Sequence, residues 1–138
     1  MCKVAVMGYG TIGSGVVEVL TTNKAVIAER TGEEVEVKYV LDLRDFPGSP
    51  VEKLLVKDYK VIVDDPEVEV VVETMGGVKP AYQFVKECLE NGKNVCTSNK
   101  ELVAAHGPEL LQIARDKNVN FLFEASVGGG IPIIRPLT

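Results

Sequence analysis

Long apolar runs, a signal segment and excess basic charge are all missing from this sequence. No apolar run approaches membrane-spanning length, which excludes a transmembrane helix. The start carries Lys3 and lacks an apolar segment with a cleavage site, so we expect no signal peptide. The net charge of −5 argues against a general surface for nucleic acid or for anionic membranes.

Cysteine and histidine are scarce. The three cysteines, Cys2, Cys88 and Cys96, have no metal-site spacing and cannot all pair with one another. Cys88 and Cys96 lie in apolar segments and are expected to be small core residues in a reducing compartment. The only histidine, His106, precedes a Gly-Pro pair that is typical of a turn entering a helix, so a structural role is favoured over a general base. These features predict a cytoplasmic protein.

A glycine-rich motif follows the first apolar run. Residues 3–7 read as a buried strand, and residues 8–13 then read Gly-Tyr-Gly-Thr-Ile-Gly before a helix pattern. This spacing between a strand and a helix predicts a dinucleotide site. Gly8 would allow the tight turn, Gly10 the approach of a pyrophosphate, and Gly13 close packing of the helix. The alternative is a glycine-rich turn without a ligand.

Strand and helix patterns alternate along the rest of the chain. The expected strands cover 3–7, 35–41, 68–73, 94–97 and 120–124, and the expected helices open at 16–20 and cover 80–91 and 108–117. The composition of residues 46–50 predicts a surface loop. The pattern of residues 54–63 is compatible with either a short helix or a weak strand. This alternation predicts an α/β fold: a Rossmann-type doubly wound parallel sheet in three α/β/α layers.

Polar residues follow the second expected strand. Asp42 could accept hydrogen bonds from the adenosine ribose and would repel a 2′-phosphate, which favours NAD slightly over NADP. Arg44 and Lys57 act in the opposite direction, since either could neutralise such a phosphate. The alternative for Asp42 is a residue that only opens a turn.

Two more strand ends carry candidates. Residues 74–77 follow the strand that ends at Glu73 and could line a cofactor. Ser98-Asn99-Lys100 follows the next strand, where Lys100 could polarise a carbonyl or hold the nicotinamide side. A solvated lysine is the alternative. Near the end, Glu124 precedes the triple glycine 128–130, whose carbonyls with a carboxylate could hold a hard cation, although spacing alone favours a hinge.

Several blocks together resemble homoserine dehydrogenase, specifically its amino-terminal nucleotide-binding domain. The blocks are residues 8–13, 72–77, 97–102, 105–107 and 123–132. The resemblance implies an NAD(P)-dependent oxidoreductase that interconverts L-homoserine and L-aspartate 4-semialdehyde, a small-molecule substrate pair of threonine and methionine biosynthesis.

The resemblance also implies roles for individual residues. It places cofactor contacts on Tyr9, Gly10, Thr11, Ile12, Thr74 and Lys100. The motif and strand-end arguments above add Gly8, Gly13, Asp42, Arg44 and Ser98 to the expected cofactor site. Lys100 would also be catalytic, at the junction of nicotinamide and substrate. Glu124 and the backbone carbonyls of Val127, Gly129 and Ile131 match the monovalent-cation site of the family, for an ion such as sodium.

Two departures from the family pattern matter. Many members place an arginine directly after the second strand, whereas here Arg44 is displaced behind Asp42. In addition, the substrate and dimerisation domain of the family follows the glycine segment. We therefore expect a dinucleotide-binding domain at 1–130, the start of a connection at 131–138, no activity of this chain alone, and a homodimer only with that further domain. The alternative is a free-standing dinucleotide-binding or sensor module.

Overall fold

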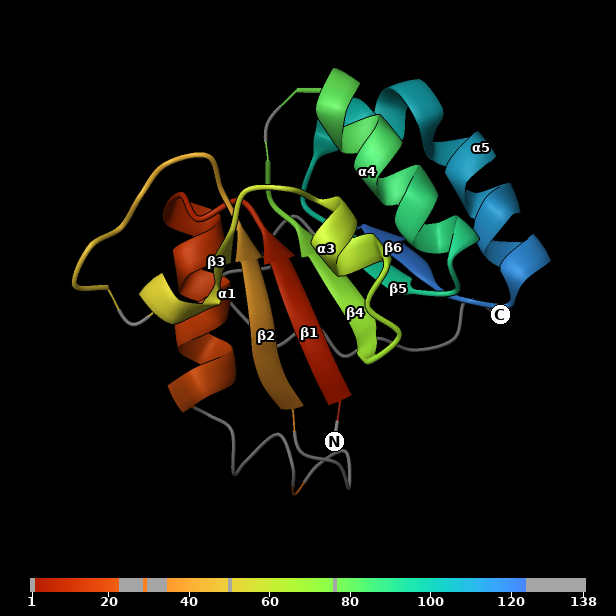
Figure 1. The fold of residues 1–138 in the computed structure, drawn as a ribbon. Helices are drawn as coiled ribbons and strands as arrows, with labels where there is room; N and C mark the ends of the chain where they lie inside the picture. Colours follow the sequence, from red (N-terminus) through yellow and green to blue (C-terminus); the bar gives the residue numbers. More distant parts are fainter. Residues whose placement is uncertain (1, 23–28, 30–34, 50, 76, 124–138) are drawn as a thin grey trace.

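The computed structural model describes residues 2–22, 29, 35–49, 51–75 and 77–123. Within them, six strands form one sheet in the order β3-β2-β1-β4-β5-β6 (Figure 1). Every neighbouring pair is parallel. The elements are β1 (Cys2–Met7), α1 (Thr11–Thr22), β2 (Val35–Leu41), η1 (Glu52–Leu54), β3 (Leu55–Val56), α3 (Lys60–Val63), β4 (Val68–Glu73), α4 (Lys79–Glu90), β5 (Asn94–Thr97), α5 (Lys100–Lys117) and β6 (Phe121–Phe123).

Helices cover both faces of the sheet (Figure 1). On β1, Val4 and Val6 join an apolar cluster with Val16 of α1. The intervening Ala5 and Met7 join the opposite cluster, which contains residues of α3, α4 and α5. Because successive strand residues point to opposite faces, one strand contributes to both cores. The expected doubly wound, three-layer α/β/α fold is confirmed.

The buried strands agree closely with the sequence-based prediction. The expected strands 35–41, 68–73 and 94–97 are β2, β4 and β5, and the first strand extends one position further, to Cys2. The ambiguous segment 54–63 contains both the short strand β3 and the short helix α3. Helix 80–91 is α4, and Gly92 follows its end with φ of 78°. Cys88 and Cys96 are fully buried core residues, as expected.

The expected turn before residue 108 is wrong. Helix α5 begins at Lys100, because the side chain of Asn99 accepts the backbone N–H of Leu102 at 3.0 Å and caps the helix. Pro108 lies inside the helix, where it removes one backbone donor without ending the element. His106 therefore lies within a helix and not in an entry turn. No helix in the described segments is long and apolar enough to cross a membrane.

Candidate functional site

The carboxyl ends of the parallel strands meet at one edge of the sheet (Figure 1). Gly8 follows β1, Asp42 follows β2, Thr74 follows β4 and Ser98 follows β5. Ligands of open parallel sheets bind outside this edge, where neighbouring connections diverge to opposite faces. In this sheet the connections diverge between β1 and β4, since α1 lies on one face and α4 on the other.

The glycine loop has the geometry that its sequence predicts. Gly8 adopts a φ of 96°, and its N–H donates to the carbonyl of Leu41 at 2.7 Å. A Cβ on Gly13 would lie 1.9 Å from the carbonyl oxygen of Gly8, so α1 packs against the loop only with glycine there. A Cβ on Gly10 would meet nothing within 4 Å. Gly10 thus leaves the start of α1 open to an approaching group.

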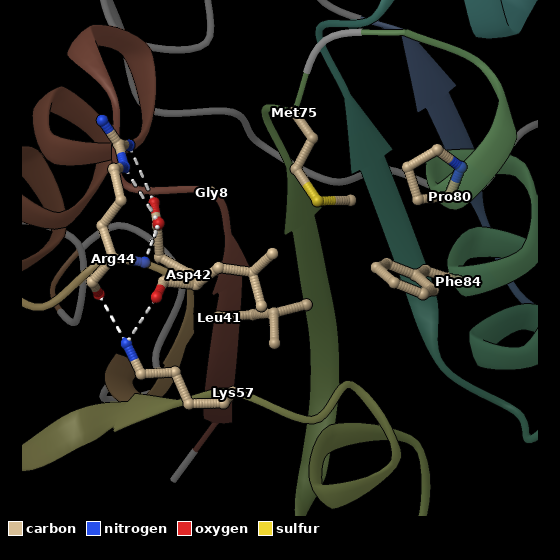
Figure 2. Close-up of a pocket in the computed structure, with 9 residues that line it drawn as sticks. Gly8, Leu41, Asp42, Arg44, Lys57, Met75, Pro80 and Phe84 are labelled. Carbon is tan, nitrogen blue, oxygen red and sulfur yellow. Dashed lines mark hydrogen bonds and ion pairs between the residues drawn. The ribbon is translucent and has the colours of Figure 1, made fainter.

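Asp42 joins the end of β2 to the glycine loop. Its Oδ2 accepts the backbone N–H of Tyr9 at 2.9 Å, and its Oδ1 accepts the backbone N–H of Arg44 at 2.9 Å. The Arg44 guanidinium donates to both oxygens, at 3.0 Å from Nε and 2.9 Å from Nη2 (Figure 2). These bonds, first of all those from the guanidinium, hold the pKa of Asp42 well below its usual range.

Lys57 lies beside the Asp42–Arg44 pair and bonds to neither of these two side chains. Its Nζ donates to the carbonyls of Leu43 at 3.0 Å and Arg44 at 2.7 Å, and it forms a 3.0 Å ion pair with Asp45. The Arg44 guanidinium also lies over the ring of Phe46, 5.2 Å from its centroid. Two cationic side chains therefore flank the carboxylate that the sequence assigns to the ribose.

A pocket of about 390 Å³ opens between the end of β2 and the start of α4 (Figure 2). Pockets of this size hold small organic ligands. One wall is apolar, and the opposite wall carries the charged groups described above (Figure 2). The lining residues are Gly8, Leu41, Asp42, Leu43, Arg44, Lys57, Met75, Pro80 and Phe84.

Thr74 and Ser98 bind the strand ends together. The Thr74 hydroxyl donates to the carbonyl of Met7 at 2.9 Å or to that of Gly8 at 3.0 Å, so it supports the glycine loop from the β4 side. The Ser98 N–H donates to the carbonyl of Glu73 at 3.1 Å. Lys100 is exposed as the first residue of α5, and its side chain forms no hydrogen bond or ion pair within the described segments. The structure therefore brings Thr74, Ser98 and Lys100 to the same edge as the glycine loop.

Sequence reasoning missed a buried carboxyl at this edge. Glu73 is fully buried, and its Oε1 accepts the hydroxyl of Thr97 at 2.6 Å. The hydroxyl of Thr97 in turn accepts the N–H of Asn99 at 3.0 Å. Burial raises the pKa of Glu73 to about 7. An acidic residue ending an otherwise apolar strand was the signal that could have found it.

His106 contributes to the contact between α4 and α5. Its ring lies 4.0 Å from that of Tyr82, centroid to centroid, and its Nδ1 is 3.7 Å from Oε1 of Glu109. The hydroxyl of Tyr82 also donates to the carboxylate of Glu109. This packing accounts for the histidine structurally, in line with the role favoured from the sequence.

Comparison with known proteins identifies the family of this chain. A family model described as "Homoserine dehydrogenase, NAD binding domain" matches residues 8–124. The chain belongs to the homoserine dehydrogenase family. It is 41% identical to homoserine dehydrogenase of Bacillus subtilis over 98% of this chain and 32% of that protein. For Pseudomonas aeruginosa homoserine dehydrogenase, the identity is 40% over 98% of this chain and 31% of that protein.

Solved structures of the family share the fold. The homoserine dehydrogenase of Thiobacillus denitrificans superposes with a TM-score of 0.81 at 37% identity, over 91% of this chain and 30% of that one. The Staphylococcus aureus enzyme at pH 8.5 gives 0.83 at 32% identity, over 91% and 32%. The chain thus spans about a third of the length of the relatives it matches. Family membership does not favour the alternative of a free-standing sensor module.

The expected cation ligands of this homoserine dehydrogenase domain, Glu124, Val127, Gly129 and Ile131, lie outside the described residues. Within the described part of the chain, no group of three or more histidine, cysteine, aspartate or glutamate side chains is placed to hold a metal ion.

Proposed function

We propose that the chain binds a nicotinamide dinucleotide, NAD or NADP, across the carboxyl ends of β2, β1, β4 and β5. The observation that carries the proposal is the open space at Gly10, directly before the start of α1. A helix N-terminus offers unpaired N–H groups and a positive dipole end to phosphate. Tyr9, Thr11 and Ile12 flank this opening and are the proposed neighbours of the pyrophosphate.

The pocket beside the loop suits the adenosine half of the ligand. Its apolar wall, with Pro80 and Phe84, fits a flat aromatic base, and Asp42 lies at the opposite wall (Figure 2). With adenosine there and the phosphates at Gly10, the nicotinamide half extends over the ends of β4 and β5, toward Thr74, Ser98 and Lys100.

Gly10→Val is expected to raise the dissociation constant of NADH at least about tenfold while the fold survives. A valine there fills the space that the pyrophosphate needs, yet its Cβ meets no other atom within 4 Å. Titration calorimetry and thermal unfolding of both forms measure the two effects. Unchanged affinity would remove the glycine loop from the proposal.

Gly13→Ala is the matched contrast. Its Cβ would lie 1.9 Å from the Gly8 carbonyl oxygen and 2.9 Å from the Thr74 hydroxyl, so it should lower stability by about 1–3 kcal/mol. Binding losses in the two variants then have different origins, and only Gly10→Val should lose affinity at full stability.

We infer a modest preference for NAD over NADP. The ribose hydroxyls would meet the Asp42 carboxylate, which already accepts the Tyr9 N–H of the glycine loop and stays ionised. A 2′-phosphate would meet a like charge there, and the guanidinium of Arg44 is already engaged with that carboxylate.

Asp42→Ser is expected to shift the ratio of the NAD and NADP dissociation constants about fivefold toward NADP, since like charges in contact with water repel by about 1 kcal/mol. The substitution also releases Arg44 to meet a phosphate. The double variant Asp42→Ser/Arg44→Met should lose this gain, which calorimetry with both cofactors measures. Tighter NADP binding by the parent chain would contradict the assigned preference.

We further propose that, joined to a substrate domain, this chain serves the interconversion of L-homoserine and L-aspartate 4-semialdehyde. Membership of the homoserine dehydrogenase family supports this reaction. The bound nicotinamide supplies or accepts the hydride, and Lys100 places a positive charge beside the reacting carbonyl. The domain at 1–130, its connection at 131–138, the homodimer, the cytoplasmic location and a monovalent cation such as sodium at Glu124 stay predictions.

A further inference from the structure

Glu73 is a buried carboxyl with one oxygen satisfied and one not. Its residue is 0% exposed, and Oε1 accepts the Thr97 hydroxyl. The oxygen of that hydroxyl also accepts the Asn99 N–H, so Thr97 links Glu73 to the start of α5. Oε2 is buried and has no hydrogen-bond partner within the described part of the chain. A buried polar atom without a partner costs free energy and calls for an explanation.

The charged groups on this face lie on α4 and α5 and form no ion pair with Glu73 in the described residues. Val71 packs in the cluster under α4 and α5, so Glu73, two positions on, points to the same face. The titratable groups on that face nearest this edge are Lys79, Tyr82 and Lys86 on α4 and Lys100, Glu101 and His106 on α5. None of them forms an ion pair or hydrogen bond with Glu73 in the described residues, and beyond β1 Asp42 and Arg44 neutralise each other.

Burial, and not a neighbouring charge, sets the pKa of Glu73. Burial raises the pKa of Glu73 to about 7, while the hydrogen bond from the Thr97 hydroxyl lowers it by a smaller amount. Near neutral pH, a single positive charge placed nearby is therefore enough to expel the proton.

Glu73 is the last residue of β4, one of the two strands over whose ends the nicotinamide half is proposed to extend. The chain continues from it into residues 74–77, and the Asn99 side chain donates to the carbonyls of Met75 at 3.1 Å and Gly77 at 2.6 Å. Thr74 holds the start of the same segment to the glycine loop. Thr74 and Met75, which follow Glu73 directly, thus lie at the strand ends over which the second half of the dinucleotide would extend.

We propose that Glu73 responds to the charge of the nicotinamide ring. The carboxyl releases its proton to solvent when the oxidised, positively charged ring binds, and it keeps the proton when the reduced, neutral ring binds. This inference rests on the proposed binding of NAD. The adenosine, ribose and phosphate groups are the same in both forms, so their influence on Glu73 cancels in a comparison of NAD⁺ with NADH.

The test compares the affinities of the 138-residue chain for NAD⁺ and NADH between about pH 6 and about pH 8.5. If the ring charge lowers the pKa of Glu73 by about one unit, the ratio of the NAD⁺ to the NADH dissociation constant falls about fivefold as the pH rises across this range. In Glu73→Gln, the ratio should not depend on pH. Calorimetry in two buffers of different ionisation enthalpy should also show proton release on NAD⁺ binding near neutrality.

Two variants separate Glu73 from other titrating groups. His106→Gln removes the only histidine and should leave the pH dependence of the ratio unchanged. Thr97→Val removes the hydrogen bond that favours the carboxylate, so the midpoint should move to higher pH.

The possible results distinguish a failure of this inference from a failure of the proposed dinucleotide binding. A chain that binds neither NAD⁺ nor NADH overturns the proposed function and the inference with it. Binding of both forms with a constant ratio overturns the inference alone, as does a pH dependence that persists in Glu73→Gln. If that variant does not fold, ¹³C spectra of carboxyl-labelled glutamates in the parent chain decide: one glutamate should titrate near neutrality and shift its midpoint downward with NAD⁺ only.

Discussion

Lys100→Ala, introduced into the complete enzyme that carries this domain, is expected to lower kcat by about 10²- to 10³-fold. Hydride transfer to an aldehyde develops negative charge on the carbonyl oxygen, and a fixed cation nearby stabilises that charge. Lys100 is exposed at the start of α5, and within the described segments no carboxylate neutralises it. Because the role belongs to the transition state, cofactor affinity should change little. Steady-state kinetics in both directions and a cofactor titration measure the two quantities.

Lys79→Ala is the matched control for this substitution. Lys79 is the exposed first residue of α4, as Lys100 is of α5, so its loss removes a comparable charge from the same edge. Turnover should be nearly unaffected. Normal turnover in Lys100→Ala would mean that this lysine is only a solvated surface charge. Measurable turnover by the 138-residue chain alone would mean that its own residues complete the active site.

The strands of this domain were readable from the sequence because they are short segments rich in β-branched and apolar residues. Residues 35–41 alternate between apolar and polar side chains, residues 68–73 are mostly valine, and residues 94–97 have Val95 and Cys96 at their centre. The bounds of all three agree with the structure. The start of α5 was not readable, since a Gly-Pro pair within a helix has the same local signal as a turn. The Asn99 cap that fixes the true start depends on the side-chain bond to Leu102.

The sequence predicted where the site residues lie but not which side chains interact with one another. The rule that strand ends converge located Asp42, Thr74 and Lys100 correctly at one edge. It could not reveal that the Arg44 guanidinium donates to the Asp42 carboxylate, because this interaction depends on the conformation of the Arg44 side chain. The role of Glu73 was missed for a similar reason. Its hydrogen-bond partner Thr97 lies beside it only because of the register in which β4 pairs with β5.

Glu73→Gln is expected to be more stable than the parent chain at about pH 8 and equally stable at about pH 4. The pKa of Glu73 rises from 4.5 to about 7 on folding. Between these values the folded chain keeps a proton that the unfolded chain has lost, so stability falls as the pH rises through this window and is constant above it. The total loss is about 3 kcal/mol, since each pKa unit corresponds to about 1.4 kcal/mol. Glutamine has no proton to lose and should show no such fall.

The size of the difference depends on how well glutamine replaces the protonated acid. Both present an acceptor to the Thr97 hydroxyl, and both place a donor where Oε2 has no partner within the described residues, so their costs should be alike. Folding lowers the pKa values of Asp42 and Asp65, so their contributions to the free energy of unfolding are lost only at more acidic pH. Urea unfolding across the neutral range therefore isolates Glu73, with the exposed Glu69→Gln on the same strand as control. Parallel pH profiles for the parent chain and Glu73→Gln would show that this carboxyl is already ionised in the folded protein.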